Sequence, residues 1–201
     1  MSAMQTAPKP ELLQDHRGEP KPWAASDLDC ASERLAGSFH EAGHAVVAMT
    51  YGIHVVTSEI MTWTHEGVWS ITGSTELDVD RVGAWQYAAM CAAGAVTEVQ
   101  YLLIAGLWTP KRALACAAVH DREQAVDVLA HYGACLGRTH VPAGGRSWAQ
   151  VRGMARRRIA YHWREIRLVA EAMNERTLLT GAEIADLTGL TNPPRPEGGA
   201  A

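Results

Sequence analysis

Residues 39–48 read FHEAGHAVVA, and this short stretch decides the expected fold and the expected chemistry. In a helix, side chains four residues apart lie on one face about 5–6 Å apart, so His40 and His44 can bind the same metal ion. Glu41 then leans over the coordination position that remains open. Zinc held by two neutral histidines and one carboxylate keeps a fourth site for water and lowers the pKa of that water to about 7. The pattern therefore predicts a Zn²⁺ site with His40 and His44 as ligands and Glu41 as general base.

The alternative is that a five-residue match of this kind arises by chance on an ordinary core or surface helix. The flanking residues favour the metal site. Phe39, Val46 and Val47 give the helix an apolar character, so it can pack in a core. Ala42 and Gly43 are small enough to allow close packing beside a metal centre.

A third protein ligand is required, and local sequence leaves two acidic residues open. Asp121 stands at the start of a predicted helix and could turn its carboxylate toward the metal. Asp121 and Gln124 also match a capping box, however, which favours an ordinary N-cap. Glu98 lies on a long apolar helix, where an unpaired carboxylate would be costly to bury. The residues by themselves do not choose between Asp121 and Glu98.

Hydrophobic periodicity and chain breakers predict a mainly α protein with one small β-hairpin. The motif helix is expected to begin near residues 26–29 and to stop at Gly52. The hairpin follows, with strands at 54–64 and 67–75 joined by residues 65–67. Four further helices are expected: one over 82–106 capped by Asp78 or Asp80, one over 121–133, one over about 147–174, and a short last helix with a capping box of Thr180 and Glu183.

The 201-residue chain is expected to hold one globular domain over residues 26–190. Residues 1–25 are rich in proline and polar side chains, which predicts a flexible arm. Residues 191–201 are expected to form a disordered tail. The apolar run at 88–107 is interrupted by glycine, glutamate and glutamine, so we interpret it as a buried helix and not as a membrane span.

Charge and cysteine usage narrow the partners and the compartment. The net charge of −4 is spread along the chain, so we expect neither nucleic acid nor a membrane as a partner. The four cysteines are far apart and form no metal-binding or disulfide pattern, which predicts free thiols in the cytoplasm. These cysteines are Cys30, Cys91, Cys116 and Cys135.

Four stretches in order carry a resemblance to a known family. They read FHEAGHAVVA, CAAGAVTEVQ, VHDREQAVDVLA and AYHWREIRLVAEAMNERTLLTGAEIADL. Together, over about residues 32–188, the chain resembles the peptidase domain of the FtsH family of ATP-dependent zinc metalloproteases. The resemblance implies a zincin-like peptidase fold, a polypeptide substrate and Asp121 as the third zinc ligand. It also implies that Glu98 lies near the site and orients a histidine by a hydrogen bond.

Departures from that family shape the functional expectation. The chain carries no phosphate-binding GxxxxGK[ST] motif, so we expect an ATP-independent endopeptidase that cleaves flexible or unfolded polypeptides. A separate unfoldase or adaptor would deliver folded substrates. Residues 93–95 read AGA where the family has Gly-Gly-Arg, which leaves homo-oligomer formation open. The alternative is a metal-stabilised binding or regulatory domain with little or no turnover.

Other aromatic and histidine residues have structural interpretations. Trp63 and Trp69 on the hairpin could line a substrate cleft, but strand tryptophans are more often packing residues. His120 lacks ligand spacing with the other lone histidines, and we assign it no role.

Overall fold

Helix α2 (Cys30–Thr50) carries the HEAGH motif and lies at the centre of the computed structural model, which describes residues 8–21, 27–65, 68–79 and 82–195. Asp29 caps the helix by accepting a hydrogen bond from the Ser32 backbone amide at 2.9 Å. The helix ends before Gly52, whose positive φ of 74° suits glycine. Most residues of its second half are fully buried, so α2 is a core helix and not a surface helix.

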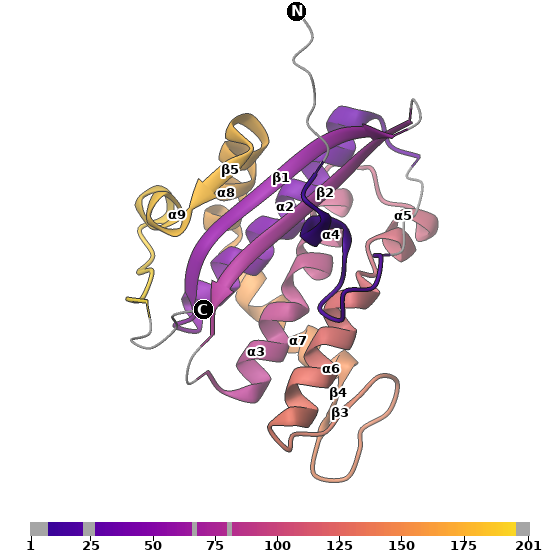
Figure 1. The fold of residues 1–201 in the computed structure, drawn as a ribbon, viewed down its shortest axis with the longest axis vertical. Coiled ribbons are helices and arrows are strands. Elements are labelled where there is room, and N and C mark those ends of the chain that lie inside the picture. The colour runs from indigo at the N-terminus through magenta and orange to yellow at the C-terminus, as the bar shows by residue number, and fades with distance from the viewer. Residues whose placement is uncertain (1–7, 22–26, 66–67, 80–81, 196–201) are drawn as a thin grey trace, which may run out of the picture.

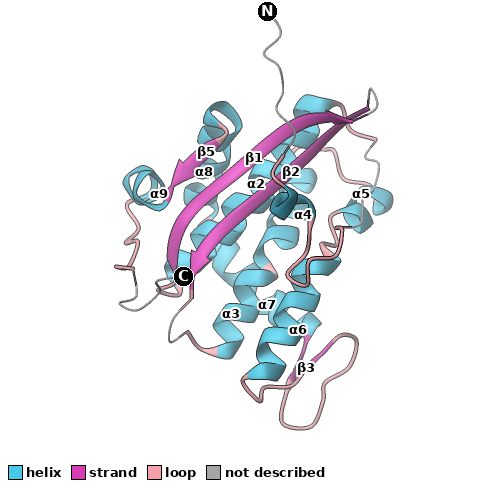
Figure 2. Ribbon diagram, viewed as in Figure 1, coloured by secondary structure: helices cyan, strands magenta, loops and turns pink. Residues whose placement is uncertain are grey.

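A small antiparallel sheet lies against one side of α2. Strands β1 (His54–His65) and β2 (Val68–Asp78) form the expected hairpin, and β5 (Leu178–Thr180) pairs with the other side of β1. The strand order is β2-β1-β5, so β2 is an edge of the described sheet. Figure 1 shows the two long strands crossing α2, and Figure 2 shows how helices make up most of the remaining structure. Residues 66–67 of the expected turn lie outside the described residues.

The expected helix over 82–106 is present as two consecutive helices, α3 (Ala84–Cys91) and α4 (Ala93–Ile104). Gly83 stands at the N-cap position, so Asp78 is not the cap, and Asp80 lies outside the described residues. The stretch Ala84–Ile104 is long and apolar enough to cross a membrane by composition alone. However, 61% of its most apolar window is buried inside the protein, as in a core helix.

The predicted helix over about 147–174 is also divided, into α7 (Trp148–Tyr161) and α8 (Trp163–Arg176). His162 breaks it although the sequence has no proline or glycine there. The break is explained by tertiary packing, because α7 packs on α4 while α8 packs on α2. The last helix, α9 (Gly181–Thr188), has the predicted capping box of Thr180 and Glu183, which is confirmed. The remaining elements are α1 (Pro10–Leu13), α5 (Pro110–Ala115), α6 (Val119–His131), β3 (Leu136–Gly137) and β4 (Arg146–Ser147).

Parts of the two terminal segments, among the residues that the structure describes, contact the rest of the protein. The expected flexible arm over 1–25 contains helix α1, and the side chain of Leu12 in that helix is buried. In the expected tail over 191–201, the Asn192 side chain exchanges two 2.9 Å hydrogen bonds with the backbone of Val55. Residues 8–21 and 191–195 therefore have specific contacts with the sheet, in segments for which the sequence predicted an arm and a tail. Residues 1–7, 22–26 and 196–201 lie outside the described residues.

Close packing of α2 on α4 predicts the effect of one added methyl group. A Cβ at Gly43 would lie 2.8 Å from Cβ of Thr97 and 2.9 Å from the carbonyl oxygen of Ala93. Because the α4 backbone cannot move away cheaply, Gly43→Ala should lower the free energy of unfolding by roughly 1–3 kcal/mol. Gly153→Ala is the matched control, since the nearest atom to its Cβ is 4.0 Å away, and alanine there should stabilise the helix by roughly 0.5–1 kcal/mol. Urea unfolding of both variants checks this, and equal stabilities would contradict the described contact.

Candidate metal centre

Helices α2 and α6 bring three potential ligand atoms together. The Nε2 atoms of His40 and His44 each lie 3.3 Å from Oδ2 of Asp121. All three atoms lie within 4.8 Å of one another. The sequence placed the two histidines one helical turn apart, and the fold adds a carboxylate from a distant segment. Glu98, the other candidate for third ligand, does not belong to this group.

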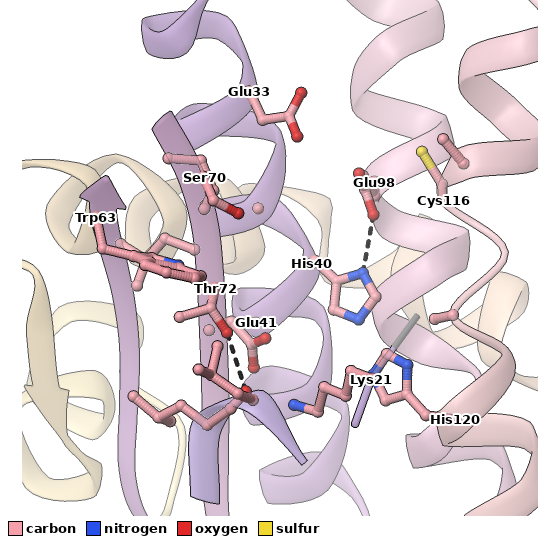
Figure 3. Close-up of a pocket in the computed structure, with 18 of the residues that line it drawn as sticks. Lys21, Glu33, His40, Glu41, Trp63, Ser70, Thr72, Glu98, Cys116 and His120 are labelled. Carbon is pink, nitrogen blue, oxygen red and sulfur yellow. Dashed lines mark hydrogen bonds and ion pairs between the residues drawn. The ribbon is translucent and has the colours of Figure 1, made fainter. Parts of the chain in front are cut away.

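Hydrogen bonds behind the two rings fix their orientation. His40 Nδ1 lies 2.9 Å from Oε2 of Glu98, an interaction drawn as a dashed line in Figure 3. His44 Nδ1 donates to the carbonyl oxygen of Met90 at 2.9 Å. Because each Nδ1 is held by an acceptor, each Nε2 points toward Asp121 with its lone pair available to a metal. Glu98 therefore lies at the position expected of a residue that orients His40.

Asp121 faces inward because helix α6 begins two residues before it. The predicted start was Asp121 itself, whereas the helix begins at Val119, after Ala118 in a left-handed conformation with φ 40°. Asp121 therefore lies in the first turn and not at the N-cap. Gln124, the partner in the alternative capping box, instead donates to the Tyr87 hydroxyl at 3.1 Å. The carboxylate of Asp121 is thus free of a capping role and faces the histidines.

The electrostatics of this group match a cation site. Burial acts to lower the pKa of His40, but hydrogen bonds and negative charge from Asp121 and Glu98 outweigh it and raise that pKa well above its usual value. Burial acts to raise the pKa of Asp121, but the two histidines outweigh it and hold that pKa well below its usual value. The two pKa shifts have the same cause, which is the attraction between the buried carboxylate and a positively charged neighbour. A proton or a divalent cation can supply that charge.

The space between the ligand atoms suits zinc. A tetrahedral zinc ion with bonds of about 2.0–2.1 Å holds two ligand atoms roughly 3.3 Å apart, and both imidazole-to-carboxylate distances are 3.3 Å. Gly94 of α4 leaves room beside these atoms, because a Cβ there would collide with Nε2 of both His40 and His44. Two imidazoles and a carboxylate also form a donor set that zinc accepts. The residues present therefore fit this metal.

Glu41 lies on the hairpin side of the same site. Its Oε2 accepts a hydrogen bond from the Thr75 hydroxyl at 2.8 Å. Gly73 on β2 makes room for the carboxylate, since a Cβ at that position would lie 2.7 Å from Oε1. Thr75 and Gly73 were not singled out from the sequence. A glycine inside a strand was the available signal, because it often marks a close approach by another group.

An open cleft of about 670 Å³ runs beside these residues. The hairpin lines one wall with apolar side chains, including Ile60, Trp63 and Ile71. Trp63 therefore lines the cleft, contrary to our interpretation of it as a packing residue. His120 also lines the cleft, and its Nε2 lies 3.3 Å from Oδ1 of Asp121, so setting it aside overlooked a residue beside the site. Burial lowers the pKa of His120.

Comparison with known proteins adds no family to this geometry: no family model matches the chain, and no curated protein matches it. The resemblance to the FtsH peptidase domain stays a prediction based on the motifs themselves.

The glycine beside the ligands provides a test of the metal site. Gly94→Ala should lower zinc affinity about 10–100-fold, because its methyl group occupies the space next to both Nε2 atoms. Gly73→Ala is the matched control, since the three atoms nearest to its Cβ all belong to Glu41 and none is a candidate ligand atom. Zinc titration with a competing chelator measures both affinities. Equal affinity in the two variants would contradict a metal site at this position.

Proposed function

We propose that this protein is a zinc metalloendopeptidase with a zincin-like fold, which hydrolyses flexible or unfolded polypeptides without ATP. His40, His44 and Asp121 would hold Zn²⁺, and Glu41 would act as general base. The observation that carries the proposal is the cluster of the two histidine Nε2 atoms with a carboxylate oxygen of Asp121. The carboxylate of Glu41, held by Thr75, lines the open cleft beside this cluster. A structural zinc site would instead have a fourth protein ligand and would not need a base.

Glu41 has the environment that proton transfer requires. Zinc bound at the ligand cluster would supply Lewis acidity and bring the pKa of water to about 7. Thr75 orients the carboxylate through Oε2, and this carboxylate would take the proton of the attacking water and later return it to the leaving amine nitrogen. Gly73 lets the carboxylate pack against β2, which limits its motion between these two transfers.

The cleft suits an extended polypeptide. Residues 70–73 of β2 line it, and β2 is one of the two edge strands of the described sheet. An extended peptide can pair with such an edge through backbone hydrogen bonds while its side chains enter an apolar groove. Folded proteins present few extended segments of this kind, so the substrate class is flexible or unfolded polypeptide.

The compartment and the partners of the protein are also part of the proposal. We propose a cytoplasmic protein that acts without nucleic acid or a membrane, because its four cysteines are free and its net charge is only −4. A separate unfoldase or adaptor would present folded proteins to it.

The decisive variants separate turnover from metal binding. Glu41→Gln should keep about one zinc per chain and lose casein hydrolysis by at least about 10³-fold, because the amide cannot accept the proton. Asp121→Ala should lose both zinc and hydrolysis, since a third ligand is removed.

Zinc content and casein hydrolysis are measured side by side for these variants and the wild type. Glu175→Gln is the matched control, because this glutamate is exposed on α8 and should leave both quantities unchanged. A binding domain without turnover would show no effect of Glu41→Gln on any measured activity, and that result would contradict the peptidase proposal.

A further inference from the structure

The N-terminal residues 8–21, which we call the strap, lie across the cleft that holds the candidate site. Leu12, Leu13, Pro20 and Lys21 line the same cleft as Glu41. Figure 1 shows this indigo segment passing in front of β2 and α4 and turning back near α6. The strap therefore forms part of the wall of the cleft that the proposed function assigns to substrate.

The strap is attached to the hairpin and to helix α6. At the hairpin, Leu12 is only 6% exposed, and the Thr72 hydroxyl donates to its carbonyl oxygen at 3.1 Å. At α6, His16 Nε2 and Arg17 Nε each lie 2.7 Å from Oδ2 of Asp127. Because Asp127 is on the helix that carries the candidate third ligand, the strap bridges the two halves of the site.

Hydrogen bonds within the strap also hold residues 13–21 in a compact loop. Oδ1 of Asp15 accepts hydrogen bonds from the backbone amides of Arg17 and Glu19, at 2.8 and 3.0 Å. The Lys21 backbone amide donates to the Leu13 carbonyl oxygen at 2.8 Å, which brings the two ends of the loop together. Figure 3 shows the Lys21 side chain reaching from the His120 side of the cleft toward Glu41. Its ammonium group thus adds positive charge beside the site.

We propose that the strap inhibits the protein in cis by covering part of the polypeptide groove, and that substrate must displace it; this inference rests on the proposed function. The strap contacts surfaces that a substrate would also contact, namely the Thr72 hydroxyl on β2 and the apolar lining of the cleft. Its attachment is weak enough to be reversible, because the ion pairs with Asp127 are partly exposed and contribute little each. Access to the groove is then an equilibrium between a closed and an open strap.

Binding of an unfolded polypeptide to catalytically silent protein tests the strap directly. The probe is fluorescently labelled, reduced and carboxymethylated casein, and the background variant is Glu41→Gln. Apparent affinity scales with the fraction of molecules whose strap is open, so Leu12→Ala should strengthen binding about tenfold and Asp127→Ala about threefold. Asp186→Ala, an exposed aspartate on α9, is the matched control and should leave affinity unchanged.

The outcomes separate this inference from the proposed function. Stronger binding in both strap variants supports the strap, even if no chain with Glu41 intact hydrolyses casein, in which case the peptidase proposal alone fails. Hydrolysis that depends on Glu41, together with binding and kcat/KM unchanged by either strap substitution, overturns the strap and leaves the peptidase proposal standing. Absence of measurable binding in all variants also overturns the strap. Asp127→Ala changes only a partly exposed side chain, so a folding defect in Leu12→Ala would not remove the test.

Discussion

Three polar side chains on one buried helix constrain the rest of this structure. His40, Glu41 and His44 lie on α2, and a buried polar group without a partner is costly. Their partners come from four other elements: the Met90 carbonyl on α3, Glu98 on α4, Asp121 on α6 and Thr75 on β2. Packing of these elements against α2 therefore assembles the core and the candidate site at the same time.

Glycine makes this assembly sterically feasible at three places. Gly43 lets α4 approach α2, Gly94 leaves room beside the two imidazoles, and Gly73 leaves room for the Glu41 carboxylate. Each of these glycines faces a different neighbour, so a methyl group at each should disturb a different property. We therefore expect the stability of the fold, the proposed metal affinity and the position of Glu41 to depend on three separate positions around α2.

Local sequence predicted the parts of the site that depend on helical periodicity, such as the spacing of His40 and His44, and it predicted the hairpin and the last capping box. The third ligand could not be chosen that way, because Asp121 and Gln124 also match an N-cap pattern and only the early start of α6 turns the carboxylate inward. The break at His162 and the burial of Leu12 depend on contacts with distant elements. Periodicity within a segment carries no information about such contacts.

The central claim is that His40, His44 and Asp121 form a zinc site, and the most direct measurement is anomalous diffraction at the zinc edge from crystals of zinc-loaded protein. The account predicts one strong peak about 2.0–2.2 Å from both Nε2 atoms and from a carboxylate oxygen of Asp121, with a coordination position open toward Glu41. A zinc-loaded crystal with no peak between these residues, or with its peak at a cysteine or a surface histidine, would contradict it.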